Sequence, residues 1–382
     1  DRKFLFMWVS GGWDPTKVFM TSNEVDRAEG DTVASYGGRQ FVSNPDRPSV
    51  DQFWAQNHQE VSVLDGMLIR SINHPICRNL WMTNTPNAGR PDWPATIAHA
   101  AADRYSVPHL IINGYNMAGE YSAFTAVSGR GGQLQALNSG LANFTTDSPY
   151  TPPPMDVQAL MDQFAANRAT ERSAAAVTDI EKHLTNSYRE AANRLIEFKQ
   201  DTVDIDLNAG GTISGQISLA TKILSGGISR CVTLSHGGGS WDTHVDNSEQ
   251  SALFASLFGD LMTLKLALEN TPGEHAATLA EETVVMVFSE MGRTPFLNST
   301  GGKDHWMYSS AMLWGPGVRG GISLGGYDPY LNGRPIDLNT GLPDDDGIPM
   351  TPDVLGSTLM TLADIDPRDE LDSDTSLSAL LA

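Results

Sequence analysis

KFLFMWVS, residues 3–10, is a near-continuous apolar run that Gly11 and Gly12 close. An apolar strand of this kind is typical of a parallel sheet covered on both faces, and the paired glycines predict a tight turn at its end. Asp14 falls on that turn. The run therefore predicts a central strand of an α/β fold with a carboxylate just past it.

Three further polar clusters also follow short apolar runs. They are Asp242 and His244 after residues 231–234, Glu290 after residues 284–288, and Asp304 and His305 farther on. Ligands collect at the carboxyl ends of the strands of an open parallel sheet, so distant segments are expected to build one site. We expect a metal-dependent centre there.

Hydrophobic periodicity predicts alternating strands and helices along the rest of the chain. We expect one α/β domain over residues 1–382, with a loop-plus-helical insertion, or cap, at residues 114–201. The predicted strands are residues 107–113, 228–234, 283–288 and 311–314, and the predicted helices are residues 94–104, 247–269, 352–362 and two within 155–201.

The charge balance limits the partners. The 25 Lys and Arg residues against 46 Asp and Glu give a formal charge of −21, which disfavours nucleic acid and anionic membranes and favours divalent cations. No apolar run approaches the roughly 20 residues of a membrane helix, and no leader is seen at Asp1, so we expect a processed protein without a membrane span. The chain has only two cysteines, Cys77 and Cys231, which are too few for a disulfide framework. A single disulfide bond between them remains an alternative.

The Gly-rich loop around Asp242 and His244 offers a carboxylate and an imidazole, a ligand set that zinc, manganese and iron accept. His305 is the candidate third ligand, and Asp304 is either a further ligand or the partner of a ring nitrogen. The alternative is that these histidines merely cap backbone carbonyls. Asp14 is likewise either a metal ligand or a turn residue that caps its own backbone.

Glu290 and Arg293 directly follow a predicted strand. The guanidinium could hold two oxygens of a phosphate or sulfate group, or Glu290 and Arg293 could simply pair with each other.

Four motifs together resemble the exported bacterial family called domain of unknown function 1501, which is placed among the alkaline-phosphatase and sulfatase-like proteins. They are Gly12-Trp13-Asp14, the stretch from Gly239 to His244, the stretch from Phe288 to Pro295, and Gly302-Lys303-Asp304-His305. The resemblance implies an alkaline-phosphatase-like fold, with a mostly parallel sheet flanked by helices. It also implies export with cleavage of a twin-arginine leader, hence a periplasmic, extracellular or cell-surface location.

The same resemblance implies site residues. Asp242, His244 and His305 resemble the trio that holds one metal ion in the superfamily. The Asp-His pair of its second metal site reads Glu290-Met291 here, so that histidine is missing. Residues 71–83 are similar to the sulfatase signature, but His74 stands near the position of the nucleophile; the possible substitutes are Ser71, Cys77, Thr83 and Thr85.

Two hypotheses follow. In the first, the protein is a metal-dependent hydrolase of a small anionic phosphate or sulfate ester. Asp242, His244 and His305 bind Zn, Mn or Ca, Arg293 steadies the anion, and Glu290 binds metal or manages a proton. In the second, it is a catalytically degenerate, metal-stabilised scaffold with protein partners in an envelope or extracellular assembly.

Overall fold

A computed structural model describes residues 2–128, 153–207, 209–371 and 373–382. β1 (Lys3–Val9) lies inside an eight-stranded sheet with the order β12-β4-β11-β8-β1-β7-β5-β6. It pairs in parallel with β7 (Cys231–His236) and β8 (Thr283–Ser289), and all seven of its residues are buried. The α/β class and the mostly parallel sheet, predicted from this run, are confirmed.

One strand of the sheet runs against its neighbours. β11 (Tyr308–Trp314) is antiparallel to β4 (Ser62–Leu68) and to β8, whereas the other pairings are parallel. The start of β11 therefore lies at the same edge of the sheet as the carboxyl ends of β1, β4, β7 and β8. The remaining strands of the sheet are β5 (His109–Ile111), β6 (Thr125–Val127) and β12 (Ser323–Gly325).

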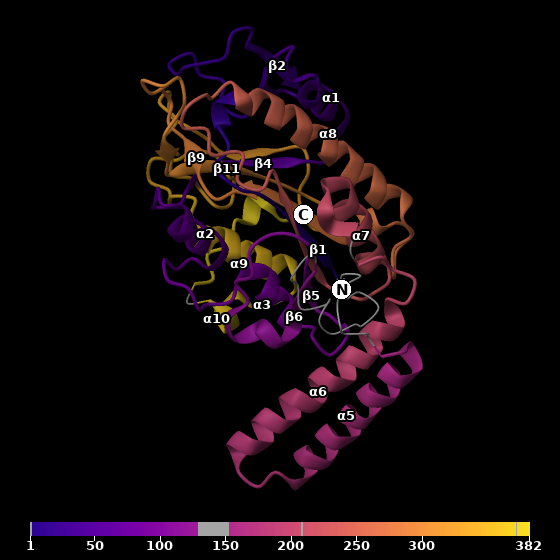
Figure 1. Cartoon of the computed structure of the whole chain (residues 1–382). Helices are drawn as coiled ribbons and strands as arrows, with labels where there is room; N and C mark the ends of the chain where they lie inside the picture. Colours follow the sequence, from indigo (N-terminus) through magenta and orange to yellow (C-terminus); the bar gives the residue numbers. More distant parts are fainter. Residues whose placement is uncertain (1, 129–152, 208, 372) are drawn as a thin grey trace.

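Helices cover both faces of the sheet, and β1 serves both cores (Figure 1). Leu5, Met7 and Val9 belong to one hydrophobic cluster and Phe4, Phe6 and Trp8 to the other, as the alternation of a strand requires. The first cluster includes α1 (Pro48–Asn57), α7 (Ile213–Ser225) and α8 (Glu249–Asn270), and the second includes α2 (His74–Thr83), α3 (Trp93–His99) and α9 (Pro352–Leu362).

α8 is, within the described ranges, the one helix with the length and apolar composition to cross a membrane. Its Phe254, Leu257, Phe258 and Leu261 lie in the first core cluster, and it packs against α1 and α7.

The two predicted helices of the insertion are present. α5 (Met155–Ala175) and α6 (Asp179–Asp201) form an antiparallel pair that projects from the body, which we call the arm (Figure 1). The expected loop before it includes an edge strand, β6, and residues 129–152 lie outside the described part. Cys77 and Cys231 are both buried and free, so no bridge joins them.

Two small antiparallel ribbons lie outside the main sheet, β2 (Thr32–Tyr36) with β3 (Arg39–Ser43), and β9 (Gly292–Arg293) with β10 (His305–Trp306). A short helix, α10 (Pro367–Glu370), follows α9. The 3₁₀ helices are η1 (Pro15–Lys17), η2 (Gly119–Phe124), η3 (Ala209–Gly211), η4 (Leu279–Glu281) and η5 (Ser378–Leu380).

Candidate metal centre

Gly11, after β1, lets two loops meet at the edge of the sheet. Its φ is +123°, and a Cβ added there would lie 2.7 Å from the backbone nitrogen of Asp242. Only glycine permits this conformation and this approach without strain. The contact places the loop after β7, which carries Asp242 and His244, directly beside the end of β1.

Three acceptor atoms converge in this region. The Nε2 atoms of His244 and His305 are 2.9 Å apart, and they lie 3.1 Å and 3.2 Å from Oδ1 of Asp242. The carboxylate comes from the loop after β7, while His305 opens the short strand β10 that precedes β11. The structure thus brings together the trio that the sequence singled out.

The other ring nitrogen of each histidine is already occupied. His305 Nδ1 donates to the carbonyl of Ile72 at 2.7 Å, and His244 Nδ1 donates to Oδ1 of Asp304 at 3.1 Å. With the proton held at Nδ1, a neutral imidazole has a bare lone pair at Nε2. Two lone pairs and a carboxylate oxygen therefore face one another without a proton between them.

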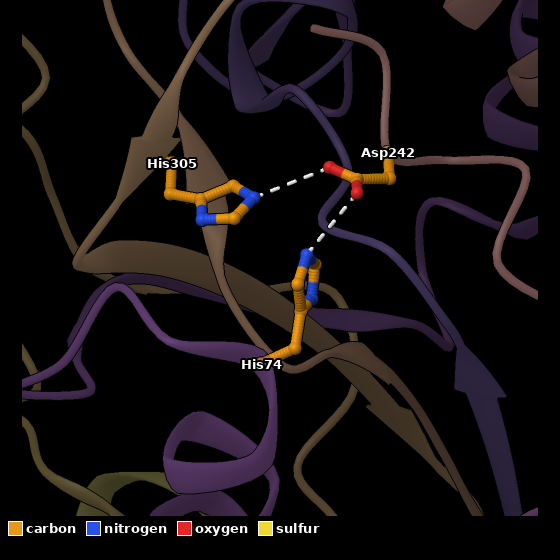
Figure 2. Close-up of side chains that lie close together, drawn as sticks. All are labelled: His74, Asp242 and His305. Carbon is orange, nitrogen blue, oxygen red and sulfur yellow. Dashed lines mark hydrogen bonds and ion pairs between the residues drawn. The ribbon is translucent and has the colours of Figure 1, made fainter.

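His74 adds a fourth group, which sequence analysis had not identified as a possible ligand. It is the first residue of α2, whose N-cap Asn73 accepts from the backbone nitrogen of Ile76. Its Nδ1 donates to Oε1 of Glu290 at 3.0 Å, and its buried Nε2 has no hydrogen-bond partner among the described residues. This orphan nitrogen lies 3.4 Å from Oδ2 of Asp242. Figure 2 shows the rings of His74 and His305 both pointing at the Asp242 carboxylate.

Three of these side chains, His74, Asp242 and His305, offer ligand atoms that all lie within 4.8 Å of one another, a grouping that could hold a metal ion. His244 lies beside this trio, with its Nε2 2.9 Å from His305 Nε2 and 3.1 Å from Asp242 Oδ1. A tetrahedral ion with ligands at about 2.0–2.2 Å holds them about 3.3–3.6 Å apart, close to the 3.2 Å and 3.4 Å that separate Asp242 from His305 and His74. Each histidine has an oxygen partner on its second nitrogen, the arrangement that orients metal-ligating imidazoles. Without a cation, the facing lone pairs of His244 and His305 would repel each other.

Protonation agrees with this role. Burial lowers the pKa of His305, which favours the neutral, metal-binding form. Burial also raises the pKa of the Asp242 carboxyl, but the hydrogen bond and positive charge of the Arg293 guanidinium outweigh it, and that pKa falls to about 2. The hydrogen bond to Glu290 raises the pKa of His74. A raised pKa favours the protonated, positively charged form of His74, and this charge faces the Asp242 carboxylate. A bound metal ion would supply the positive charge beside Asp242 instead.

Glu290 is an orienting group rather than a ligand. Its Oε1 accepts from the Gly11 backbone and His74, and its Oε2 accepts from Trp8 Nε1 at 3.2 Å. The side chain is 1 % exposed. Its lone pairs are therefore occupied, and its interaction with the centre passes through His74.

Arg293 corrects an expectation. It is fully buried and donates to the carbonyls of Gly11, Gly12, Trp241 and Lys303, and to Oδ1 of Asp242 at 2.6 Å. A guanidinium that is fully buried among these acceptors is not accessible to a substrate. It holds Asp242 in place instead, and it does not pair with Glu290 as the alternative had it.

Asp14 also lies apart from the centre. Its Oδ1 accepts from the backbone and hydroxyl of Thr16, and its Oδ2 lies 2.7 Å from Nδ2 of Asn247 and 3.0 Å from Nζ of Lys303. The turn-capping alternative describes this residue, because both oxygens are occupied by the protein.

No strong nucleophile stands at the start of α2. Cys77 is buried, and burial raises its pKa to about 11. Thr83 donates to the carbonyl of Asn79 at the far end of the helix. Ser71 lies before the helix, where its hydroxyl accepts from the backbone nitrogen of Asn73.

The family model described as "Protein of unknown function (DUF1501)" matches residues 1–371. No curated protein matches the chain.

Solved structures to which the chain is similar include three proteins. Ps i-CgsB in complex with k-i-k-neocarrahexaose is 9% identical with a TM-score of 0.45, over 98% of this chain and 75% of that one. The lipoteichoic acid synthase LtaP from Listeria monocytogenes is 9% identical with a TM-score of 0.44, over 99% and 76%. Alkaline phosphatase from the Antarctic bacterium TAB5 is 12% identical with a TM-score of 0.36, over 85% and 95%.

Proposed function

The chain belongs to the DUF1501 family, and from the geometry of its site we propose that it is a metal-dependent hydrolase of phosphate or sulfate esters. The observation that carries the proposal is the convergence of three oriented imidazoles on the Asp242 carboxylate, with His74 Nε2 buried and unpartnered. An ion held there would supply positive charge to an ester oxygen and would lower the pKa of a water molecule.

The donor set indicates which ion. Imidazole nitrogens with one carboxylate suit zinc, manganese or iron, whereas calcium takes six to eight oxygen ligands. Of the ions considered from the sequence, Zn and Mn therefore fit this site and Ca does not.

Arg78 takes the anion-binding role that Arg293 cannot perform. It lies four residues after His74, hence on the same side of α2. Its guanidinium carbon is 3.8 Å from the ring centroid of Tyr115, and it makes no hydrogen bond or ion pair with any residue that the structure describes. A guanidinium that an aromatic ring holds while its donors stay free suits a phosphate or sulfate group.

Tyr115 ties Arg78 to the centre. Its hydroxyl lies 3.4 Å from Oγ of Ser10, which precedes the Gly11 contact, and its ring packs edge-on against Trp8 at 5.4 Å. Trp8 in turn donates to Glu290, the partner of His74. Since the first turn of α2 carries no activated hydroxyl or thiol, water is the attacking group in this proposal.

A second candidate has its own support. If His244 joins His74, Asp242 and His305 on the ion, the site has four protein ligands and is closed, as structural zinc sites are, whereas catalytic sites keep one position open. If His74 is a permanent ligand, the centre would stabilise a scaffold in an envelope or extracellular assembly. The two candidates therefore differ in whether His74 stays on the ion.

Metal analysis and ester assays separate these candidates. We expect purified protein to bind about one equivalent of Zn or Mn, and Asp242→Ala and His305→Ala to lose it. A panel of phosphomonoesters, phosphodiesters and sulfate esters should then show turnover that Arg78→Ala lowers and Arg70→Ala, a control on the neighbouring loop, does not. Protein without stoichiometric metal would refute both candidates, and loaded protein inert toward every ester would favour the scaffold.

Location belongs to the same proposal. The family resemblance implies export, so we propose a periplasmic or cell-surface site of action. Fractionation of the native cells, with a cytoplasmic marker enzyme as the control, should place the protein outside the cytoplasm; recovery with the marker would contradict it.

A further inference from the structure

The arm exposes large apolar side chains along both of its helices. They include Leu160 at 72 %, Phe164 at 71 % and Met161 at 53 % on α5, with Ile180 at 74 %, Leu184 at 61 % and Tyr188 at 55 % on α6. A projecting element that exposes several large apolar side chains on each helix is a candidate interaction site.

The contact between the two helices has the opposite character. Ala166 and Ala169 are the buried residues of α5, and the pair is joined by polar contacts, Asp162 with Lys199 at 2.6 Å and Ser173 with Asn186. An amphipathic helix normally turns its large apolar residues inward. Here small and polar groups lie inside the pair and the large apolar groups lie outside, so the pair by itself does not bury them.

The exposed residues form one stripe on each helix. On α5, residues 157, 160, 161 and 164 follow the spacing i, i+3, i+4 and i+7, and on α6, residues 180, 184 and 188 follow a four-residue spacing. At about 100° per residue, both stripes turn to the same broad side of the antiparallel pair. That side of the arm, which carries one stripe toward each end, is called its apolar face below.

The two stripes occupy opposite ends of that face. The body end of the arm is fixed by Phe198, which lies in the first hydrophobic cluster together with Leu5 and Met7, and by Arg194, which donates to the carbonyl of Ala123. The α5 stripe lies in the first half of α5, near the body, whereas the α6 stripe lies next to the α5–α6 turn at the tip (Figure 1). A two-fold axis across the middle of the face would lay the α5 stripe of one arm on the α6 stripe of another.

The low net charge of the arm favours contact with the arm of a second copy. Residues 155–201 contain eight acidic and six basic residues, a net charge of −2, whereas the whole chain carries −21. Arm-to-arm contact therefore brings two nearly neutral surfaces together while the acidic bodies stay at the far ends.

We propose that the arm is a dimerisation surface and that its occupant is the arm of a second copy of this chain, packed antiparallel as a four-helix bundle. The dimer is independent of the metal centre, which lies on the body.

Sedimentation velocity on the full chain tests this pairing. We expect a dimer for the unaltered protein, and Phe164→Glu or Leu184→Lys should raise the dissociation constant at least about 30-fold, as loss of a central apolar contact does. Gln163→Glu and His183→Lys, which add the same charges off the stripes, should leave it unchanged. Circular dichroism and metal content establish that each variant is folded.

A mixing experiment tests the crossed contact directly. In a mixture of the Phe164→Glu and Leu184→Lys proteins, one interface half carries opposite charges and the other is unaltered, so the heterodimer should form where neither variant dimerises alone. A monomeric unaltered chain would overturn the proposal and leave a different protein to cover the face. A dimer that both stripe variants preserve would overturn it too.

Discussion

Asp304 and Ile72 decide which nitrogens of the two facing histidines are free. The carboxylate of Asp304 accepts from His244 Nδ1, and this hydrogen bond lowers the pKa of Asp304. The Asp304 side chain is 62 % exposed, so its replacement disturbs little packing. Its effect should fall on the orientation of His244.

Asp304→Asn should therefore weaken metal binding about 10- to 100-fold without unfolding the protein, because the partner that orients a metal-ligating imidazole is weakened. Competition with a chelating dye measures this change, with Asp345→Asn, which alters an acid far from the centre, as the control. An unchanged affinity would separate Asp304 from the centre.

The buried pair of Asp14 and Lys303 should stabilise the edge of the sheet. Removing one partner of a buried ion pair costs about 3–5 kcal/mol, so Asp14→Asn should lower the free energy of unfolding at pH 7 by that amount. Asp14→Asn with Lys303→Met, which removes both charges, should lose less.

This loss should depend on pH. Burial raises the pKa of Asp14, but Lys303 and Lys17 outweigh it and hold that pKa below its usual 3.8. Such a group contributes stability above its unfolded pKa, and the contribution is lost as the pH falls through the lower folded pKa. Urea unfolding at pH 7 and at pH 3 should show the difference between Asp14→Asn and the unaltered protein shrinking; a constant difference would contradict the charge argument.

At the scale of elements, the reversed strand β11 explains why His305 reaches the centre. Asp242 and His244 follow a parallel strand, as polar clusters at a sheet edge are expected to do. His305 precedes a strand, and it arrives at the same edge because β11 runs antiparallel. The motifs predicted this residue; the strand pattern alone did not.

His74 and Arg293 show what the sequence could not predict. β4, which leads to His74, reads Ser-Val-Leu-Asp-Gly-Met-Leu, and Asp65 and Gly66 break the apolar run that marks a strand. Arg293 follows a clear strand, but loops from three other parts of the chain supply the carbonyls that surround it. Such contacts depend on tertiary structure, which local sequence patterns do not predict.

The close approach at Gly11 makes a prediction about the β1 turn. Gly11→Ala places a methyl group 2.7 Å from the Asp242 nitrogen and should displace that loop, lowering metal affinity at least about 10-fold. Gly238→Ala is the matched control in the same loop, since its φ is also positive, at +51°, but nothing lies within 4 Å of the added carbon. Equal losses in both variants would mean that backbone strain alone matters.

At the scale of the whole molecule, the centre joins segments that are far apart in the chain. His74 precedes the arm, while the other three ligands follow it. An ion that binds only the folded chain raises the free energy of unfolding by about 2.7 kcal/mol at 100 times its dissociation constant.

Added Zn or Mn should therefore raise the thermal midpoint of the chelator-treated protein, and His305→Ala should abolish the increase. Differential scanning calorimetry with and without the ion measures it, with Asp345→Asn as a control that keeps the response. If no added ion changed the thermal midpoint, the proposal that a metal ion links these segments would be contradicted.

The position of His305 has a consequence for biosynthesis. The side chain of His305 follows 304 earlier residues of this sequence, and it is placed only when β11 joins the sheet between β4 and β8. If the centre binds an ion as we propose, a nascent polypeptide that has not yet reached His305 would lack one of the ligands.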